Sequence, residues 1–290
     1  MKLNKNISDK DNKHIATAEK SLYRACPELD LGGSRGLTLI KVGGKIVENP
    51  ETLKQLLTDF ADIEGYKVLV HGGGRSATAL AETLGIETKM VNGRRITDRN
   101  MLQVVTMVYG GLVNKNIVTG LQALEVNALG LTGADLNYMR SEKRPVKDVD
   151  YGYVGDVKEV NGEILAELIH KGITPVLAPL THDKKGNLLN TNADTIAGEA
   201  AKALAKFFDV TLVFCFEKKG VLADENDDDS VIEKINFASF KKLVADGVIS
   251  GGMIPKLENS FDALNAGVKE VIITRADKIT TDKIGTHINL

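Results

Sequence analysis

The most constraining feature of this sequence is a run of three glycines that directly follows a short apolar segment. Residues 67–77 are KVLVHGGGRSA, and the chain continues as an alanine-rich stretch. The apolar residues predict a buried strand, the glycines a tight loop, and the continuation the start of a helix. Without side chains in between, backbone N–H groups can approach a ligand closely, and a helix N-terminus adds partial positive charge. The segment therefore predicts a site for phosphate or another anion.

A second glycine turn lies upstream. Residues 37–42 (LTLIKV) form another apolar run, which leads into Gly43 and Gly44. In open α/β sheets, ligands bind beyond the carboxyl ends of the strands. Two strands that end in glycine turns therefore suggest one anion cradled from two sides.

Strand-like and helical segments alternate along most of the chain. This alternation favours an α/β fold with an open, mostly parallel sheet that is covered by helices on both faces. The dipeptide Asn92-Gly93 between two short runs predicts a hairpin turn. Apolar residues on one stripe of a long expected helix, residues 99–121, predict core packing, with a dimer interface as the alternative. That stripe comprises Met101, Val104, Val105, Val108, Leu112 and Val113.

Composition excludes several classes of function. The net charge of −2 gives no electrostatic case for binding nucleic acid or an anionic membrane. No apolar run approaches the roughly 20 residues that span a bilayer. Cys26 and Cys215 predict neither a disulfide framework nor a metal cluster. We expect a cytoplasmic protein, with residues 1–36 as a flexible N-terminal extension that either is disordered or serves as a regulatory or oligomerising arm.

Two local motifs indicate other classes of function, and both are weak evidence. Gly72-x-Gly74-x-x-Ala77 matches a loose dinucleotide fingerprint, but no acid-tipped second strand follows at the expected distance. Gly32-x-Ser34-x-Gly36 matches a hydrolase nucleophile elbow, but a polar segment precedes the serine where a strand is required. A nicotinamide-dependent oxidoreductase remains a distant alternative.

Five motifs occur together in a specific order, namely IKVGG, VHGGG, NGRRITD, LNTNAD and GGMIPK. In order and approximate spacing they resemble the amino acid kinase family, and most closely its members that phosphorylate N-acylated glutamate. The resemblance extends from Leu37 to the C-terminus. It implies a three-layer αβα sandwich and a single domain over residues 37–290. The acceptor would bind to the half at about 37–180, and ATP to the half at about 181–290.

The activity implied by the resemblance is transfer of the γ-phosphoryl group of ATP to the side-chain carboxylate of N-acetyl-L-glutamate. The product is an acyl phosphate, in arginine biosynthesis. A glutamate side chain has a pKa of about 4.3 and is ionised at neutral pH, so the reaction requires no general base. The obstacle is repulsion between two anions, which fixed positive charge and amide donors relieve. ATP and Mg²⁺ are implied, with the metal held through the phosphates because the sequence shows no protein metal cluster.

Three residues are candidates for catalysis by this resemblance. Lys41 and Lys256 would hold the transferring phosphoryl group and the leaving oxygens, and Asp194 would orient both lysines. Simpler interpretations exist for each of them. Lys41 could be a strand-end lysine in solvent, Lys256 a surface lysine of a helix, and Asp194 an acid favoured by the positive end of a helix.

The resemblance also implies binding residues. Those for the acceptor and the phosphates are Gly44, Gly72, Gly73, Arg95 and Asn190, with Arg95 on the substrate α-carboxylate. Those for ATP are Glu217, Lys218, Lys219, Gly220, Val221, Leu222, Gly251, Gly252 and Met253.

Two departures from the family pattern leave alternatives open. Arg94 stands where the family has an aliphatic residue, so N-succinyl-L-glutamate is an alternative acceptor. Glu217 stands where the family has aspartate. A sister kinase acting on carbamate, aspartate or UMP, and a non-catalytic amino-acid sensor, also fit the fold. The short C-terminal segment favours a homodimer without feedback by arginine.

Overall fold

The structure is a computed structural model that describes residues 36–91, 93–224, 226–279 and 285–290. The expected N-terminal extension, residues 1–36, lies outside the described residues except for Gly36, and so does Cys26. None of the helices in the described segments is long and apolar enough to cross a membrane.

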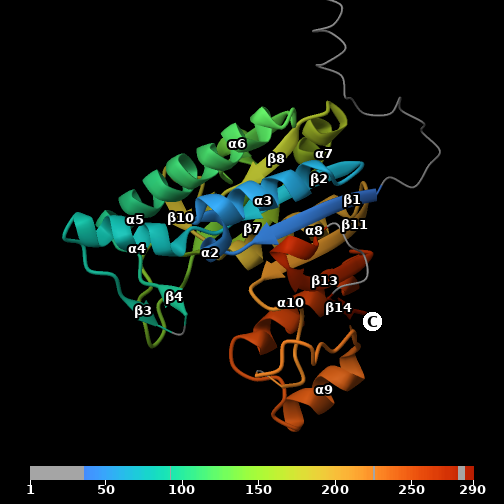
Figure 1. The fold of residues 1–290 in the computed structure, drawn as a ribbon. Helices are drawn as coiled ribbons and strands as arrows, with labels where there is room; N and C mark the ends of the chain where they lie inside the picture. The colour runs from blue at the N-terminus through green and yellow to red at the C-terminus, as the bar shows by residue number, and fades with distance from the viewer. Residues whose placement is uncertain (1–35, 92, 225, 280–284) are drawn as a thin grey trace, which may run out of the picture.

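A sheet of eight strands forms the centre of the molecule (Figure 1). The strands lie in the order β12-β14-β13-β11-β1-β2-β8-β5. All neighbouring pairs are parallel except β13 with β14, so the predicted mostly parallel sheet is confirmed. The bounds are β1 Gly36–Val42, β2 Tyr66–His71, β5 Ala128–Leu131, β8 Thr174–Leu177, β11 Asp209–Phe216, β12 Lys234–Ile235, β13 Glu270–Arg275 and β14 Thr286–Ile288.

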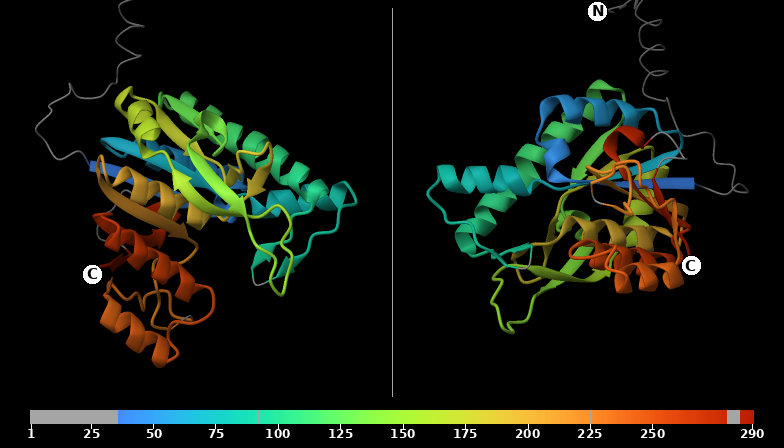
Figure 2. Two further views of the ribbon diagram at one scale, coloured as in Figure 1. Left: turned by 180° about the vertical axis from the view of Figure 1, so that it is seen from behind. Right: turned by 60° about the horizontal axis from the view of Figure 1, so that its bottom comes forward.

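Helices cover both faces of this sheet, which confirms the three-layer sandwich (Figure 2). One face carries α2 Gly44–Val47, α3 Pro50–Ala61, α4 Gly74–Thr83, α5 Arg99–Val105 and α6 Asn114–Ala123. The other carries α7 Gly162–His170, α8 Ala193–Leu204, α9 Phe237–Ala245 and α10 Met253–Asn265. Along β1, Leu37 and Leu39 face the second set, whereas Ile40 and Val42 face the first. This alternation is the period of two expected of a strand buried on both sides.

Short strands form two further sheets beside the main one. The first has four strands in the order β10-β9-β6-β7, and the second is the hairpin of β3 with β4. Their bounds are β3 Met90–Val91, β4 Arg94–Arg95, β6 Met139–Lys143, β7 Gly155–Val160, β9 Leu180–His182 and β10 Leu188–Asn190. The antiparallel β3–β4 pair confirms the predicted hairpin, and Gly93 in its turn has a φ of 71°, which favours glycine.

The long helix expected over residues 99–121 differs from the prediction in its middle. Helix α5 is followed by a π-helical segment, Thr106–Val113, and then by α6. Most of the predicted apolar stripe is buried in the core, but Leu112 is 56% exposed. A π-helical turn contains more residues than an α-helical one, so residues after it no longer follow the expected period. The prediction that Leu112 belongs to the buried stripe was therefore wrong.

A buried polar network supports the point where β2 ends. His71 donates from Nδ1 to the carbonyl of Gly72 (2.7 Å) and accepts at Nε2 from the side-chain amide of Asn114 (3.1 Å). The same amide donates to the carbonyl of Val176 (3.0 Å). Burial lowers the pKa of His71 to about 4, so the ring is neutral at pH 7. A side chain at Gly130 would collide with Asn114 Oδ1, which explains the glycine on β5.

Replacing Asn114 tests this network. The Asn114→Ala variant leaves His71 Nε2 and the Val176 carbonyl without their buried donor, which should lower the free energy of unfolding by about 3 kcal/mol. Urea denaturation measures the loss. The control is Gln55→Ala, which removes an exposed hydrogen bond to Asp59 and should change stability by less than about 0.5 kcal/mol. Equal losses in the two variants would show that the network does not support β2.

Candidate active site

The two glycine turns lie side by side at one edge of the central sheet. Strands β1 and β2 pair in parallel with Val42 opposite His71, and the N–H of Gly72 donates to the carbonyl of Val42 (3.0 Å). A Cβ atom on Gly72 would lie 3.0 Å from the backbone nitrogen of Gly44. The backbones approach so closely that this position favours glycine, because any side chain would require the first glycine turn to shift. The structure thus brings together Gly44, Gly72 and Gly73, as the sequence predicted.

Glu48 joins these two turns, and sequence reasoning did not identify it. The carboxylate oxygen Oε1 accepts from the N–H of Ser76 in the first turn of α4 (2.8 Å). A Cβ atom on Gly44 would lie 3.3 Å from the same oxygen. A carboxylate is favoured at a helix N-terminus, so this contact fixes α4 relative to the first glycine turn. An acid shortly after a glycine turn is too common a pattern to have revealed it.

Lys41 and Asp194 form a largely buried ion pair. Lys41 Nζ lies 2.6 Å from Asp194 Oδ1, and only 7% of the surface of Lys41 is exposed. Asp194 lies in the first turn of α8, where the Asn192 side chain caps the helix by accepting from the backbone N–H of Asp194 (2.7 Å). The interpretation of Lys41 as a solvent-exposed strand-end lysine was wrong.

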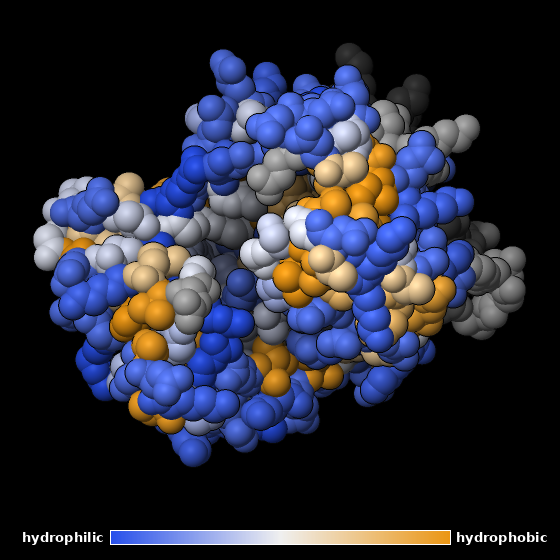
Figure 3. Space-filling model, turned by 90° about the horizontal axis from the view of Figure 1, so that it is seen from below, coloured by the Kyte–Doolittle hydropathy of each residue, from blue (hydrophilic) through white to orange (hydrophobic). Residues whose placement is uncertain are grey.

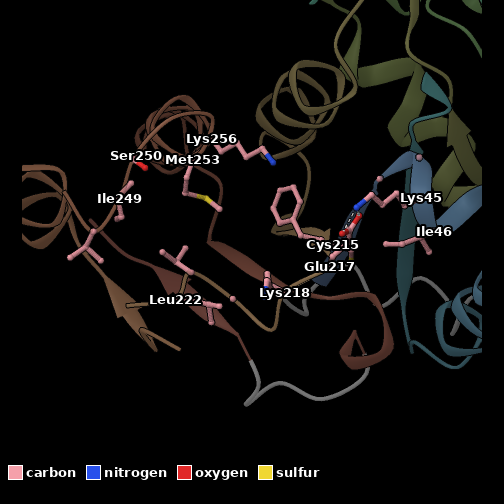
Figure 4. A pocket seen from close by; sticks show the side chains of 16 residues that line it. Lys45, Ile46, Cys215, Glu217, Lys218, Leu222, Ile249, Ser250, Met253 and Lys256 are labelled. Atoms are coloured by element: carbon pink, nitrogen blue, oxygen red, sulfur yellow. Dashed lines mark hydrogen bonds and ion pairs between the residues drawn. The ribbon is translucent and has the colours of Figure 1, made fainter. Parts of the chain in front are cut away.

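Lys256 extends from α10 toward the same region (Figure 4). Its ammonium nitrogen lies 3.7 Å from the centre of the Phe216 ring, and that of Lys41 lies 5.4 Å from the same centre. The pKa of Lys256 is lowered, mainly by burial and also by the nearby charge of Lys41, while the charge of Asp194 opposes this shift. The structure therefore brings the three candidate catalytic residues together from β1, α8 and α10.

A cavity of about 530 Å³ opens beside these residues, between the first glycine turn, the end of β11 and α10 (Figure 4). Of the nine residues predicted to bind ATP, six line it, namely Glu217, Lys218, Gly220, Val221, Leu222 and Met253. Lys219, Gly251 and Gly252 are not among its lining residues, and Lys219 instead forms an ion pair with Asp229. Seen from below, the molecular surface is hollowed at its centre (Figure 3).

Lys45 is a further residue of the cavity wall that sequence reasoning missed. It lies in α2, directly after the first glycine turn, and forms an ion pair with Glu217 at the end of β11. Both side chains are about half exposed, so the pair contributes little to stability. Its position nevertheless joins the glycine turn to the opposite wall of the cavity.

The two residues predicted to bind the acceptor are joined through Thr97. The guanidinium of Arg95 is buried and donates from Nη2 to the carbonyl of Gly74 (2.8 Å) and to the hydroxyl of Thr78 (2.9 Å). The hydroxyl of Thr97 donates to the carbonyl of Arg95 (3.1 Å) and accepts from the side-chain amide of Asn190 (2.9 Å). Arg95 therefore lies against the start of α4, next to the second glycine turn.

Arg94, its neighbour on β4, is exposed on the hairpin. Partial burial lowers its pKa, and the nearby guanidinium of Arg144 lowers it further, while Asp156 raises it. The structure thus places the guanidinium groups of Arg94 and Arg144 and the carboxylate of Asp156 near one another, with Arg94 directly after the hairpin turn.

Comparisons with known proteins agree with this arrangement. The sequence model described as "Amino acid kinase family" matches residues 36–275. Acetylglutamate kinase of Parabacteroides distasonis is 75% identical over 252 residues, which cover 87% of this chain and 98% of that protein. The enzyme of the same name from Bacteroides thetaiotaomicron is 73% identical with the same coverage of both chains. The crystal structure of smu.665 from Streptococcus mutans UA159 superimposes with a TM-score of 0.71, is 32% identical, and covers 87% of this chain and 98% of that one.

The buried Lys41–Asp194 pair can be tested by removing its charges one at a time. Asp194→Asn leaves the Lys41 ammonium buried without its partner and should lower the free energy of unfolding by about 3 kcal/mol. The double variant Lys41→Met, Asp194→Asn buries neither charge and should regain most of that loss. Urea denaturation measures all of these values.

The matched control for this cycle is Glu87→Gln, which removes an exposed pair with Lys89 (3.0 Å) and should cost less than about 1 kcal/mol. The cycle also needs the single variant Lys41→Met. If the double variant loses as much stability as Asp194→Asn and Lys41→Met lose together, the two charges are not coupled.

Proposed function

The chain belongs to the amino acid kinase family, and we propose that its site transfers the γ-phosphoryl group of ATP to the side-chain carboxylate of N-acetyl-L-glutamate. The product is an acyl phosphate, an intermediate of arginine biosynthesis. The observation that carries this proposal is the convergence of Lys41, Asp194 and Lys256 beside two joined glycine turns. The names of relatives that are 73% and 75% identical support the same acceptor.

The proposed roles follow from the charge balance of the reaction. An ionised carboxylate can attack phosphorus without a general base, so the protein has to overcome the repulsion between two anions. Lys41 and Lys256 would hold the transferring phosphoryl group, while Gly44, Gly72 and Gly73 would donate backbone N–H groups. Asp194 would fix the position of Lys41 through their ion pair and would favour the charged form of Lys256.

The cavity fits ATP in size and in the character of its walls. Its volume of about 530 Å³ lies in the range of small-molecule sites. Apolar side chains at one end, Val221, Leu222, Ile249 and Met253, would contact the base. The glycine turn and Lys256 would contact the phosphates; Glu217, Lys218 and Gly220 also line the cavity, with Glu217 paired to Lys45 directly after the glycine turn (Figure 4).

We propose that Mg²⁺ binds through the phosphates rather than in a site of its own. Within the described residues no group of three or more histidine, cysteine, aspartate or glutamate side chains is arranged to hold a metal. This fits the usual behaviour of Mg²⁺ in kinases, which keeps several waters and binds through one or two carboxylates together with substrate phosphates. Bound Mg²⁺ would neutralise part of the phosphate charge; Glu217 lines the cavity, and Asp194 is paired with Lys41.

For the acceptor, we propose that Arg95 binds the α-carboxylate of the substrate and that Asn190 is a further substrate-binding residue. Arg95 donates from Nη2 to the Gly74 carbonyl and the Thr78 hydroxyl and from Nη1 to the Thr88 hydroxyl (3.3 Å), and the remaining N–H donors of its guanidinium would serve a carboxylate. The acceptor-binding half would comprise residues at about 37–180, and the ATP-binding half residues at about 181–290, within one domain. Use of ATP in a biosynthetic step supports a cytoplasmic location.

The main test is the release of ADP from ATP and Mg²⁺ with a panel of acceptors. We expect turnover with N-acetyl-L-glutamate, and kcat lower by on the order of 10²–10³ in Lys41→Met and in Lys256→Met. N-succinyl-L-glutamate, carbamate, aspartate and UMP complete the panel. The names of the relatives do not favour N-succinyl-L-glutamate.

Each outcome of this assay bears on a specific alternative. If kcat/KM is higher for N-succinyl-L-glutamate than for N-acetyl-L-glutamate, and falls in Arg94→Leu, the acceptor is the succinylated compound and not the acetylated one. Turnover of another acceptor alone would indicate a sister kinase. Binding of ATP or of an amino acid without turnover of any acceptor would indicate a sensor.

We also propose that the protein is a homodimer. Exposed apolar residues on the long helix, such as Met107 and Leu112, are available for a contact between copies. Light scattering should give one species of about twice the 31.3 kDa mass of the chain, and its activity should not respond to arginine. A hexamer, or inhibition by millimolar arginine, would contradict this proposal.

A further inference from the structure

Phe216, the last residue of β11, touches both candidate catalytic lysines. We propose that Phe216 is a positioning residue, whose ring holds the ammonium groups of Lys41 and Lys256 together beside the transferring phosphoryl group. This inference rests on the roles proposed above for the two lysines. The ring belongs to neither the predicted catalytic residues nor the predicted binding residues.

The position of the ring follows from the register of the central sheet. Lys41 on β1 pairs in parallel with Phe214 on β11, so their side chains lie on the same face of the sheet. Phe216 lies two residues further along β11 and therefore occupies that face too. The rings of Phe214 and Phe216 stack with their centres 6.3 Å apart and their planes 14° from parallel. Helices α8 and α10 cover this face, and they carry Asp194 and Lys256.

The contacts have the geometry of cation–π interactions. Lys256 Nζ lies 3.7 Å from the centre of the Phe216 ring and Lys41 Nζ lies 5.4 Å from it. Both distances are within the range of about 6 Å over which the negative face of an aromatic ring attracts a cation. One ring therefore contacts two ammonium groups that come from opposite ends of the sequence.

An aromatic ring suits this position better than a second carboxylate would. Lys41 and Lys256 repel each other, and Asp194 is already paired with Lys41. A further carboxylate would bind the N–H donors of the lysines and would repel the incoming phosphates. The ring attracts both cations through its quadrupole, yet it carries no net charge and accepts no conventional hydrogen bond. The ammonium N–H groups consequently stay available for phosphate oxygens.

The test first removes the aromatic ring and then changes only the electron density on the face of the ring. Phe216→Leu keeps an apolar side chain without a π face, and we expect kcat to fall about tenfold, which corresponds to about 1.4 kcal/mol. The KM for the acceptor should change much less, because the lysines act on the phosphoryl group. Phe216→Tyr keeps the π face and should retain kcat within about twofold. A graded series of fluorinated phenylalanines at position 216 should lower kcat stepwise, since each fluorine weakens the negative face of the ring.

The matched control is Phe237→Leu. Phe237 on α9 forms a comparable contact with Lys241, whose Nζ lies 4.4 Å from the ring centre, and it is not a lining residue of the cavity. Its replacement should leave kcat unchanged. An unchanged kcat in Phe216→Leu would overturn the inference. A fall in Phe216→Leu without any trend along the fluorinated series would overturn it as well, because packing alone would then account for the loss.

A second measurement separates this inference from the proposed function. The ε-methylene protons of Lys256 should show an upfield ring-current shift in NMR spectra, which is lost in Phe216→Leu and kept in Phe216→Tyr. Lys256→Met identifies the resonance. Absence of the shift in an active enzyme would overturn the inference alone. If the shift is present but the protein turns over no acceptor, the contact between Phe216 and Lys256 is confirmed. The proposed function is then wrong, and so is the role of Phe216 that depends on it.

Discussion

The parallel pairing of β1 with β2 is the constraint on which the rest of the site depends. With Val42 opposite His71, both strands end at the same level, and the glycine turns that follow them meet at one edge of the sheet. A Cβ atom at Gly72 would lie only 3.0 Å from the backbone nitrogen of Gly44, so a side chain there would push the two turns apart. A shift of one residue in this pairing would separate the turns and would also move Lys41 to the wrong face of the sheet.

The register between β1 and β11 then determines on which face of the sheet Lys41, Asp194 and Lys256 come together. Because Lys41 shares a face with Phe214 and Phe216, its side chain lies under α8 and α10, where Asp194 and Lys256 are located. Ile40 and Val42, on the other face, pack against α-helices that carry no part of this cluster. Burial of Lys41 is tolerated because Asp194 compensates its charge. One strand thus supplies apolar packing on one face and a buried, paired cation on the other.

Much of this arrangement could be predicted from the sequence, because its signals are local. Glycines that directly follow apolar runs predicted both turns, and the order of the motifs identified Lys41, Asp194 and Lys256 as candidate catalytic residues. Glu48, Lys45 and Phe216 were missed because their roles depend on partners far away along the chain, 28 residues for Glu48, 172 for Lys45, and Lys41 on β1 for Phe216. The π-helical segment was missed for a similar reason. Its residues Tyr109 and Val113 pack closely against Gly73, a contact between distant parts of the chain that a local pattern does not reveal.

The polar groups beneath the glycine turns differ in kind from those in the cavity. His71 is buried and neutral at pH 7, because burial lowers its pKa to about 4, so it fixes the Gly72 carbonyl without adding positive charge. Glu48 fixes the first turn of α4 from the other side, with its carboxylate at the positive end of the helix. Support for the backbone and charge for the ligand are therefore provided by separate residues. The glycine turns are thus supported by groups that carry no positive charge, and in the proposed reaction the lysines beside Phe216 would supply the positive potential that a phosphate meets.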